Sequence, residues 1–108
     1  MYDRRIFERI PASFPVKFWD IQANKIGEAE VEDVSAEGLG FISSENLMPG
    51  VNLGMWLEIP DGKERLYLQG AVAESKGVNQ NSYHIGVELV KPELMGMARV
   101  LRTNRSFA

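Results

Sequence analysis

Two groups of residues in this 108-residue chain have types and spacings that could bind a small anionic ligand. The first is a set of arginines near the N-terminus, namely Arg4, Arg5 and Arg9. The second lies further along the chain and consists of Asp33, Ser35 and Gly38. Guanidinium groups donate strong, charge-assisted hydrogen bonds to phosphates and match the acceptor pair on a guanine edge. Asp33 and Ser35 are two residues apart, so in an extended segment their side chains project to the same side.

Both groups also have a simpler explanation. Arginines near the end of a chain are commonly a solvated, charged terminus. Aspartate and serine commonly make local hydrogen bonds within a turn, and glycine commonly allows the chain to turn. The residue types alone leave both explanations open for each group.

The composition argues against several other kinds of site. The chain has no cysteine, which excludes disulfides and thiolate metal ligands and fits a reducing cytoplasm. Its net charge of −3 argues against binding a nucleic acid polymer. No apolar run reaches the roughly 18 residues of a membrane span, so we expect no membrane insertion. The sequence offers no nucleophile–base pair, and its single histidine, His84, is expected to face solvent from a strand; we therefore expect no enzyme activity.

Apolar and polar residues alternate along the middle of the chain, which is the period of half-buried β-strands. Turn signals such as Pro60-Asp61-Gly62 separate the strands, and the polar stretch 76–81 predicts a loop. Strands at this regular spacing favour a small antiparallel barrel or sandwich. The six predicted strands span residues 15–20, 27–32, 39–43, 53–59, 65–74 and 82–90.

The last part of the chain has a helical pattern instead. Pro92 suits the first turn of a helix, whereas Gly96 weakens the helix by about 1 kcal/mol relative to alanine. We expect Met95 and Met97 to be packing residues. One helical face carries the apolar residues Leu94, Met97, Ala98 and Leu101. The cations near the C-terminal end, which suit the helix dipole and are expected to be solvated, are Arg99, Arg102 and Arg105.

Two motifs make the chain resemble a known family. Arg5-Ile-Phe-Glu-Arg9 and Asp33-Val-Ser-Ala-Glu-Gly38 are similar to the RxxxR and D/NxSxxG signatures of the PilZ domain, at the family's spacing. The stretch YHIGVEL also resembles the family's late strand. The resemblance implies an all-β fold: a six-stranded antiparallel PilZ-type β-barrel with a C-terminal α-helix. It divides the chain into a flexible N-terminal arm (1–10), the barrel (11–90), and the helix and tail (91–108).

The resemblance also implies a bacterial receptor for cyclic di-GMP. Arg5 and Arg9 would bind its phosphates and guanine edges, while Asp33 and Ser35 would bind a guanine and Gly38 would shape the turn. The chemistry of these residues fits that ligand. An arginine fork matches guanine O6 and N7, and a carboxylate accepts from guanine N1–H and N2–H. Adenine lacks O6 and the N2 amino group, so cyclic di-AMP would pair poorly with the same residues.

The placement of the arginines suggests how such a receptor would signal. Without ligand the three arginines repel one another, and with ligand the arm would fold onto the barrel. Arg4 adds a third guanidinium, which favours binding of a second, stacked ligand molecule. We expect a monomer or weak homodimer that has no attached output domain and signals to an unidentified effector protein. The alternative is a ligand-independent PilZ-like adaptor in pilus or flagellar machinery.

Overall fold

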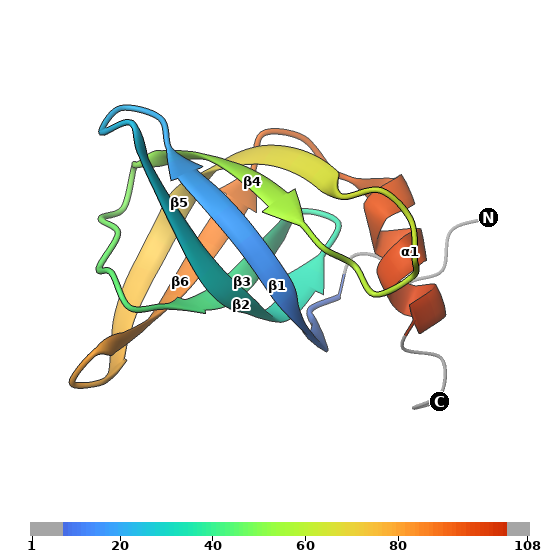
Figure 1. Cartoon of the computed structure of the whole chain (residues 1–108), viewed down its shortest axis with the longest axis horizontal. Coiled ribbons are helices and arrows are strands. Elements are labelled where there is room, and N and C mark those ends of the chain that lie inside the picture. The colour runs from blue at the N-terminus through green and yellow to red at the C-terminus, as the bar shows by residue number, and fades with distance from the viewer. Residues whose placement is uncertain (1–7, 104–108) are drawn as a thin grey trace.

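The computed structural model of the chain describes residues 8–103, which form six strands and one helix (Figure 1). All neighbouring strands are antiparallel, and they close into a barrel in the order β1-β2-β3-β6-β5-β4. The expected six-stranded barrel with a C-terminal helix is therefore confirmed. The elements are β1 (Ile10–Asp20), β2 (Lys25–Ser35), β3 (Gly38–Ser43), β4 (Asn52–Leu57), β5 (Leu66–Asn79), β6 (Ser82–Leu89) and α1 (Leu94–Thr103).

The barrel interior is filled by the inward-facing residues of the alternating strands. Phe18 on β1 and Phe41 on β3 stack with ring centroids 5.4 Å apart, and both rings are almost fully buried. Gly27 on β2 lies directly against the Phe18 ring and leaves it the space that a larger residue would fill. Burying side chains of this size contributes about 1.5–3 kcal/mol each, so this apolar interior is the main source of the barrel's stability.

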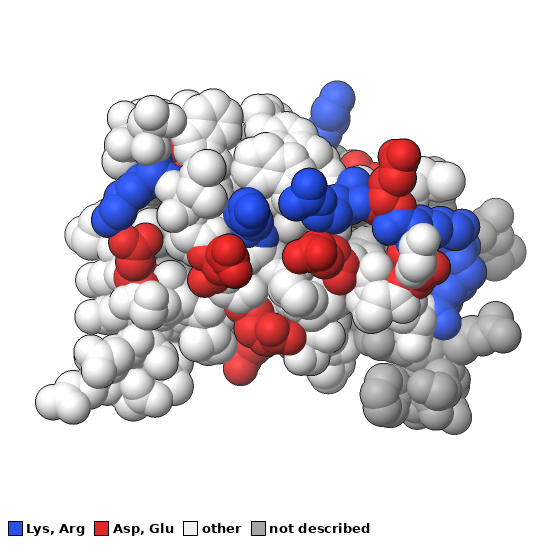
Figure 2. Space-filling model, viewed as in Figure 1, with Lys and Arg blue, Asp and Glu red and all other residues white. Residues whose placement is uncertain are grey.

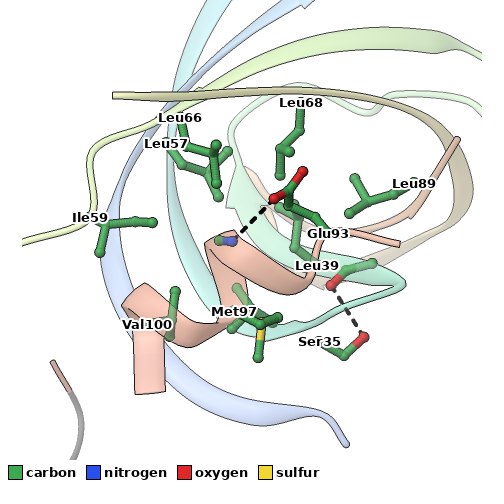
Figure 3. Close-up of a pocket in the computed structure, with 13 residues that line it drawn as sticks. Ser35, Leu39, Leu57, Ile59, Leu66, Leu68, Leu89, Glu93, Met97 and Val100 are labelled. Carbon is green, nitrogen blue, oxygen red and sulfur yellow. Dashed lines mark hydrogen bonds between the residues drawn. The ribbon is translucent and has the colours of Figure 1, made fainter. Parts of the chain in front are cut away.

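Helix α1 lies across one end of the barrel and covers its apolar interior (Figure 1). Met97 and Val100 point toward the barrel and leave only a small gap of about 20 Å³ beside Leu39 and Leu66 (Figure 3). The side chain of Glu93 accepts a hydrogen bond from the backbone N–H of Gly96 at 3.1 Å, which satisfies one of the free amides at the start of the helix. No helix within residues 8–103 is long and apolar enough to cross a membrane.

Two sequence-based expectations for the strands and helix are wrong. The predicted loop at 76–81 is mostly strand, because β5 continues to Asn79 and pairs with β6 beyond the barrel, where backbone hydrogen bonds need no apolar side chains. Met95 is 75% exposed and does not pack, since the helix turns Gly96, Met97 and Val100 inward instead. Gly96 sits against Leu66, so its small size lets the helix approach the barrel.

Arg99 is also not the solvated helix residue that its position predicts. Its guanidinium donates to both carboxylate oxygens of Asp61 at 2.7 and 3.0 Å, and to the backbone carbonyl of Glu64 at 2.8 Å. Both side chains of the pair are largely buried, with 15% and 13% of their surface exposed. The hydrogen bond from Arg99 holds the pKa of Asp61 well below its ordinary value of 3.8. The pair ties α1 to the β4–β5 loop, 38 residues earlier in the chain.

We predict that Asp61→Asn lowers the stability of the protein near neutral pH and makes that stability change less as the pH falls into the acid range. A carboxyl group whose pKa is lowered by folding stabilises the folded state above its ordinary pKa, and this contribution is lost as the pH falls. The denaturation midpoints of wild type and variant should therefore differ at about pH 7 and approach each other progressively as the pH falls below the ordinary pKa of 3.8 and through the lowered pKa of the folded state. Glu64→Gln, which alters an exposed carboxylate of the same loop, is the control and should follow the wild type. A wild-type advantage that persists undiminished in acid would contradict this account of the pair.

Candidate functional site

Arg9 and Asp33 form an ion pair where the start of β1 lies beside the end of β2. The first residues of β1 pair with the last residues of β2, Ile10 with Val34 and Pro11 with Asp33. This register brings Arg9 beside a carboxylate 24 residues away, and Arg9 Nη1 lies 2.6 Å from Asp33 Oδ1. The side chain of Arg9 is half exposed and that of Asp33 about one-third exposed. An ion pair this accessible contributes at most about 1 kcal/mol and is easily exchanged for a ligand contact.

Ser35 and Gly38 form the turn that joins β2 to β3. The Ser35 hydroxyl accepts a hydrogen bond from the Glu37 N–H at 3.2 Å and donates to the Gly38 carbonyl at 3.4 Å. Gly38 is needed for close packing, because a Cβ here would lie 2.4 Å from the carbonyl oxygen of Val87 on β6. Ser35 is largely buried, and its hydroxyl makes local hydrogen bonds within the turn, as serine commonly does.

The turn is also bonded to the beginning of α1. The carbonyl of Ala36 accepts from the Glu93 N–H at 2.7 Å, and the carbonyl of Glu37 accepts from the Leu89 N–H at 2.9 Å. These two backbone hydrogen bonds connect the turn to the end of β6 and to the residue that precedes α1.

His84 is part of the same cluster, although the sequence suggested a solvent-facing residue. Its Nε2 lies 3.5 Å from Asp33 Oδ2 and 4.0 Å from Glu32 Oε1, and only 25% of its side chain is exposed. The alternation of β6 already indicated that His84 lies on the outer face, opposite Ile85. The pairing of β6 with β3, which brings this face next to β2, was not available from the sequence.

An open depression of about 690 Å³ lies beside these residues. Arg9, Ser35, Gly38 and His84 all line it, and Asp33 lies at its margin through its contacts with Arg9 and His84. Its lining also includes Glu74 on β5 and the segment from Val90 to Pro92 that leads into α1. Arg4 and Arg5, the other two predicted site residues, lie outside the described residues.

The charges elsewhere on the molecule are mixed in sign. Figure 2 shows lysines and arginines lying next to aspartates and glutamates on the face that includes β1 and β2. Lys17, for example, is directly opposite Glu28 in the strand register. In the part of the chain from residue 8 to 103, no group of three or more histidine, cysteine or acidic side chains could hold a metal ion.

Comparisons with known proteins agree with this architecture. A family model described as "PilZ domain" matches residues 3–103. The PilZ domain of YcgR from Escherichia coli, solved with c-di-GMP, is 13% identical with a TM-score of 0.67, covering 96% of this chain and 91% of that one. The PilZ domain of CeSA from a cellulose-synthesizing bacterium is 20% identical with a TM-score of 0.61, and the match covers 93% of this chain and 97% of that one.

A third similar structure is a longer protein. The inhibitor of motility MotI/DgrA from Bacillus subtilis is 14% identical with a TM-score of 0.70, and the match covers 98% of this chain. The match covers 53% of that protein, so the chain spans about half of its length. At these identities the structural matches establish the fold alone. A search of curated protein sequences finds no match.

We predict that Gly38→Ala destabilises the protein. The added methyl group would meet a backbone carbonyl of β6, which can move only by separating two paired strands, so we expect a loss of about 1–3 kcal/mol in the free energy of unfolding. The matched control is Gly77→Ala on β5, where a Cβ meets nothing within 4 Å and where the change should stay within about 0.5 kcal/mol. Denaturant unfolding of both variants measures the difference. Equal stability of the two would show that β3 and β6 are not held as closely as described.

Proposed function

Because this chain belongs to the PilZ domain family, we propose that it is a bacterial cytoplasmic receptor that binds cyclic di-GMP and signals to a partner protein. The observation that carries the proposal is the Arg9–Asp33 pair. The RxxxR arginine and the D/NxSxxG aspartate, 24 residues apart, meet beside an open depression. Neither side chain is needed for the core, so both are available to a ligand.

The chemistry of the pair suits a guanine nucleotide. Arg9 would bind guanine O6 and N7 or a phosphate, and Asp33 would accept from N1–H and N2–H of the base. A ligand with two phosphates would also compensate the positive charge of the arginines. The E. coli YcgR domain, whose fold this chain shares, was solved with c-di-GMP, which supports the choice of ligand.

The remaining predicted residues have distinct proposed roles. Arg5 completes the arginine motif, and Arg4 supplies a further cation and a planar surface on which a guanine can stack. Ser35 and Gly38 hold the turn next to the base, with the Ser35 hydroxyl available to exchange its long 3.4 Å bond to Gly38 for a ligand contact. No covalent step is assigned to any residue, so the proposed role is that of a receptor rather than an enzyme.

The signal would leave the site through the turn and the helix. The carbonyls of Ala36 and Glu37 are bonded to Glu93 and Leu89, so a ligand that moves the turn also moves the start of α1. Met95, near that start, is exposed and available to an effector protein.

We predict that the protein binds cyclic di-GMP and binds cyclic di-AMP much more weakly. Arg9→Ala and Asp33→Ala should each weaken binding by about 1.5–3 kcal/mol, roughly 10- to 150-fold, because each removes a charge-assisted contact. Both variants should unfold within about 1 kcal/mol of the wild type, since the pair is accessible to solvent. Titration calorimetry measures affinity and specificity together.

The control for this experiment is Arg65→Ala, which removes an exposed arginine that follows the β4–β5 loop. It should bind like the wild type apart from a small loss of long-range attraction. Full affinity in Asp33→Ala, or equal affinity for the two cyclic dinucleotides, would overturn the proposed recognition. No binding at all by the wild type would favour the alternative, a PilZ-like adaptor that acts without ligand.

We also predict two ligand molecules per chain, and a shift toward one in Arg4→Leu. Two stacked ligands bring four phosphates into one site, and the third guanidinium offsets part of that charge. The stoichiometry from calorimetry on both proteins decides this. One ligand per wild-type chain, or two per variant chain, would remove the role given to Arg4.

A further inference from the structure

His84 contacts the carboxylate that is proposed to read the ligand. Arg9 approaches Asp33 from the side of Oδ1 at 2.6 Å, and His84 Nε2 lies 3.5 Å from Oδ2. A carboxylate can only accept hydrogen bonds, so the contact with His84 is a hydrogen bond when the proton is on Nε2. Asp33 is thus held at one oxygen by Arg9, which precedes β1, and at the other by His84 of β6.

This arrangement leaves the carboxylate free to bind a base. The two oxygens of a carboxylate offer about four lone-pair directions, and Arg9 and His84 use one on each oxygen. One acceptor position remains on each oxygen, which is the arrangement needed to meet the adjacent N1–H and N2–H of a guanine together. Without His84, Asp33 would be fixed at Oδ1 alone and its carboxylate could rotate.

Gly40 on β3 provides the space in which Asp33 and His84 meet. A Cβ at this position would lie 2.6 Å from His84 Nε2 and 3.0 Å from Asp33 Oδ1. Gly40 is paired with Gly86 in the register of β3 and β6, so both strands present bare backbone at this point. The imidazole occupies the space over Gly40 and is buried there to three-quarters of its surface.

We propose that His84 is a positioning residue that orients Asp33 so that both of its oxygens face the guanine edge, and thereby sets the preference of the site for guanine. This inference rests on the proposed function. It does not require His84 to touch the ligand. Glu32 Oε1 lies 4.0 Å from the same nitrogen, which is beyond hydrogen-bond distance.

The test compares cyclic di-GMP with its inosine analogue, cyclic di-IMP, which lacks only the 2-amino groups. A correctly oriented Asp33 gains one hydrogen bond per recognised base from that amino group, so the wild type should prefer cyclic di-GMP by about tenfold. His84→Ala should lower this ratio below about threefold. His84→Gln, whose amide N–H can replace Nε2–H, should restore most of it. Calorimetry with both dinucleotides on each protein gives the ratios.

Three further variants separate orientation from a general loss of structure. Gly40→Ala should lower the ratio as His84→Ala does, because its methyl group would meet both the imidazole and the Asp33 carboxylate, whereas Gly77→Ala should leave the ratio unchanged. Lys76→Ala, at the β5 position directly opposite His84, should also keep it. An unchanged ratio in His84→Ala overturns the inference while cyclic di-GMP binding by the wild type still supports the proposed function. Wild-type protein that binds neither dinucleotide overturns both.

Discussion

The close approach of β3 and β6 is the constraint on which the rest of the site depends. Gly38 has no room for a Cβ against the β6 backbone, and Gly40 has none against the side chains of His84 and Asp33. Because these two positions carry no side chain, side chains from β2 and β6 have room to meet over the outer face of this strand pair. The same pairing closes the barrel, so one steric condition determines both the fold and the position of the polar cluster.

The sequence predicted the parts of this structure that depend on local pattern. Alternating apolar residues located the six strands, and two short motifs identified Arg9, Asp33, Ser35 and Gly38. The contact of His84 with Asp33 was missed because it joins residues 51 positions apart, a separation that no periodicity encodes. Arg99 was missed for the same reason: an arginine on a helix looks solvated until the loop that carries Asp61 is placed beside it. The end of β5 was missed because strands outside the barrel need no apolar face.

The Arg99–Asp61 and Arg9–Asp33 ion pairs differ in their burial and in their number of hydrogen bonds. Arg99 and Asp61 are largely buried and bidentate, and they fix the helix to the barrel. Arg9 and Asp33 have a single short contact and are far more exposed. Since a buried pair is costly to break and an exposed one is not, a charged ligand can compete for the second without loosening the first.

The closed strand order also limits how another protein can attach to this one. Each strand of the described barrel has a neighbour on both sides along part of its length, and a partner cannot extend the sheet by backbone pairing at those doubly paired residues. Beyond Val72, the described pairing of β5 is with β6 alone, which leaves a short backbone edge. That edge contains Lys76 and is interrupted by register shifts after Val72 and Gly77, features that oppose the addition of a further strand. Along the strand residues that are paired on both sides, recognition of this molecule therefore falls to side chains, and the surface there can diverge between relatives while the backbone of the barrel stays the same.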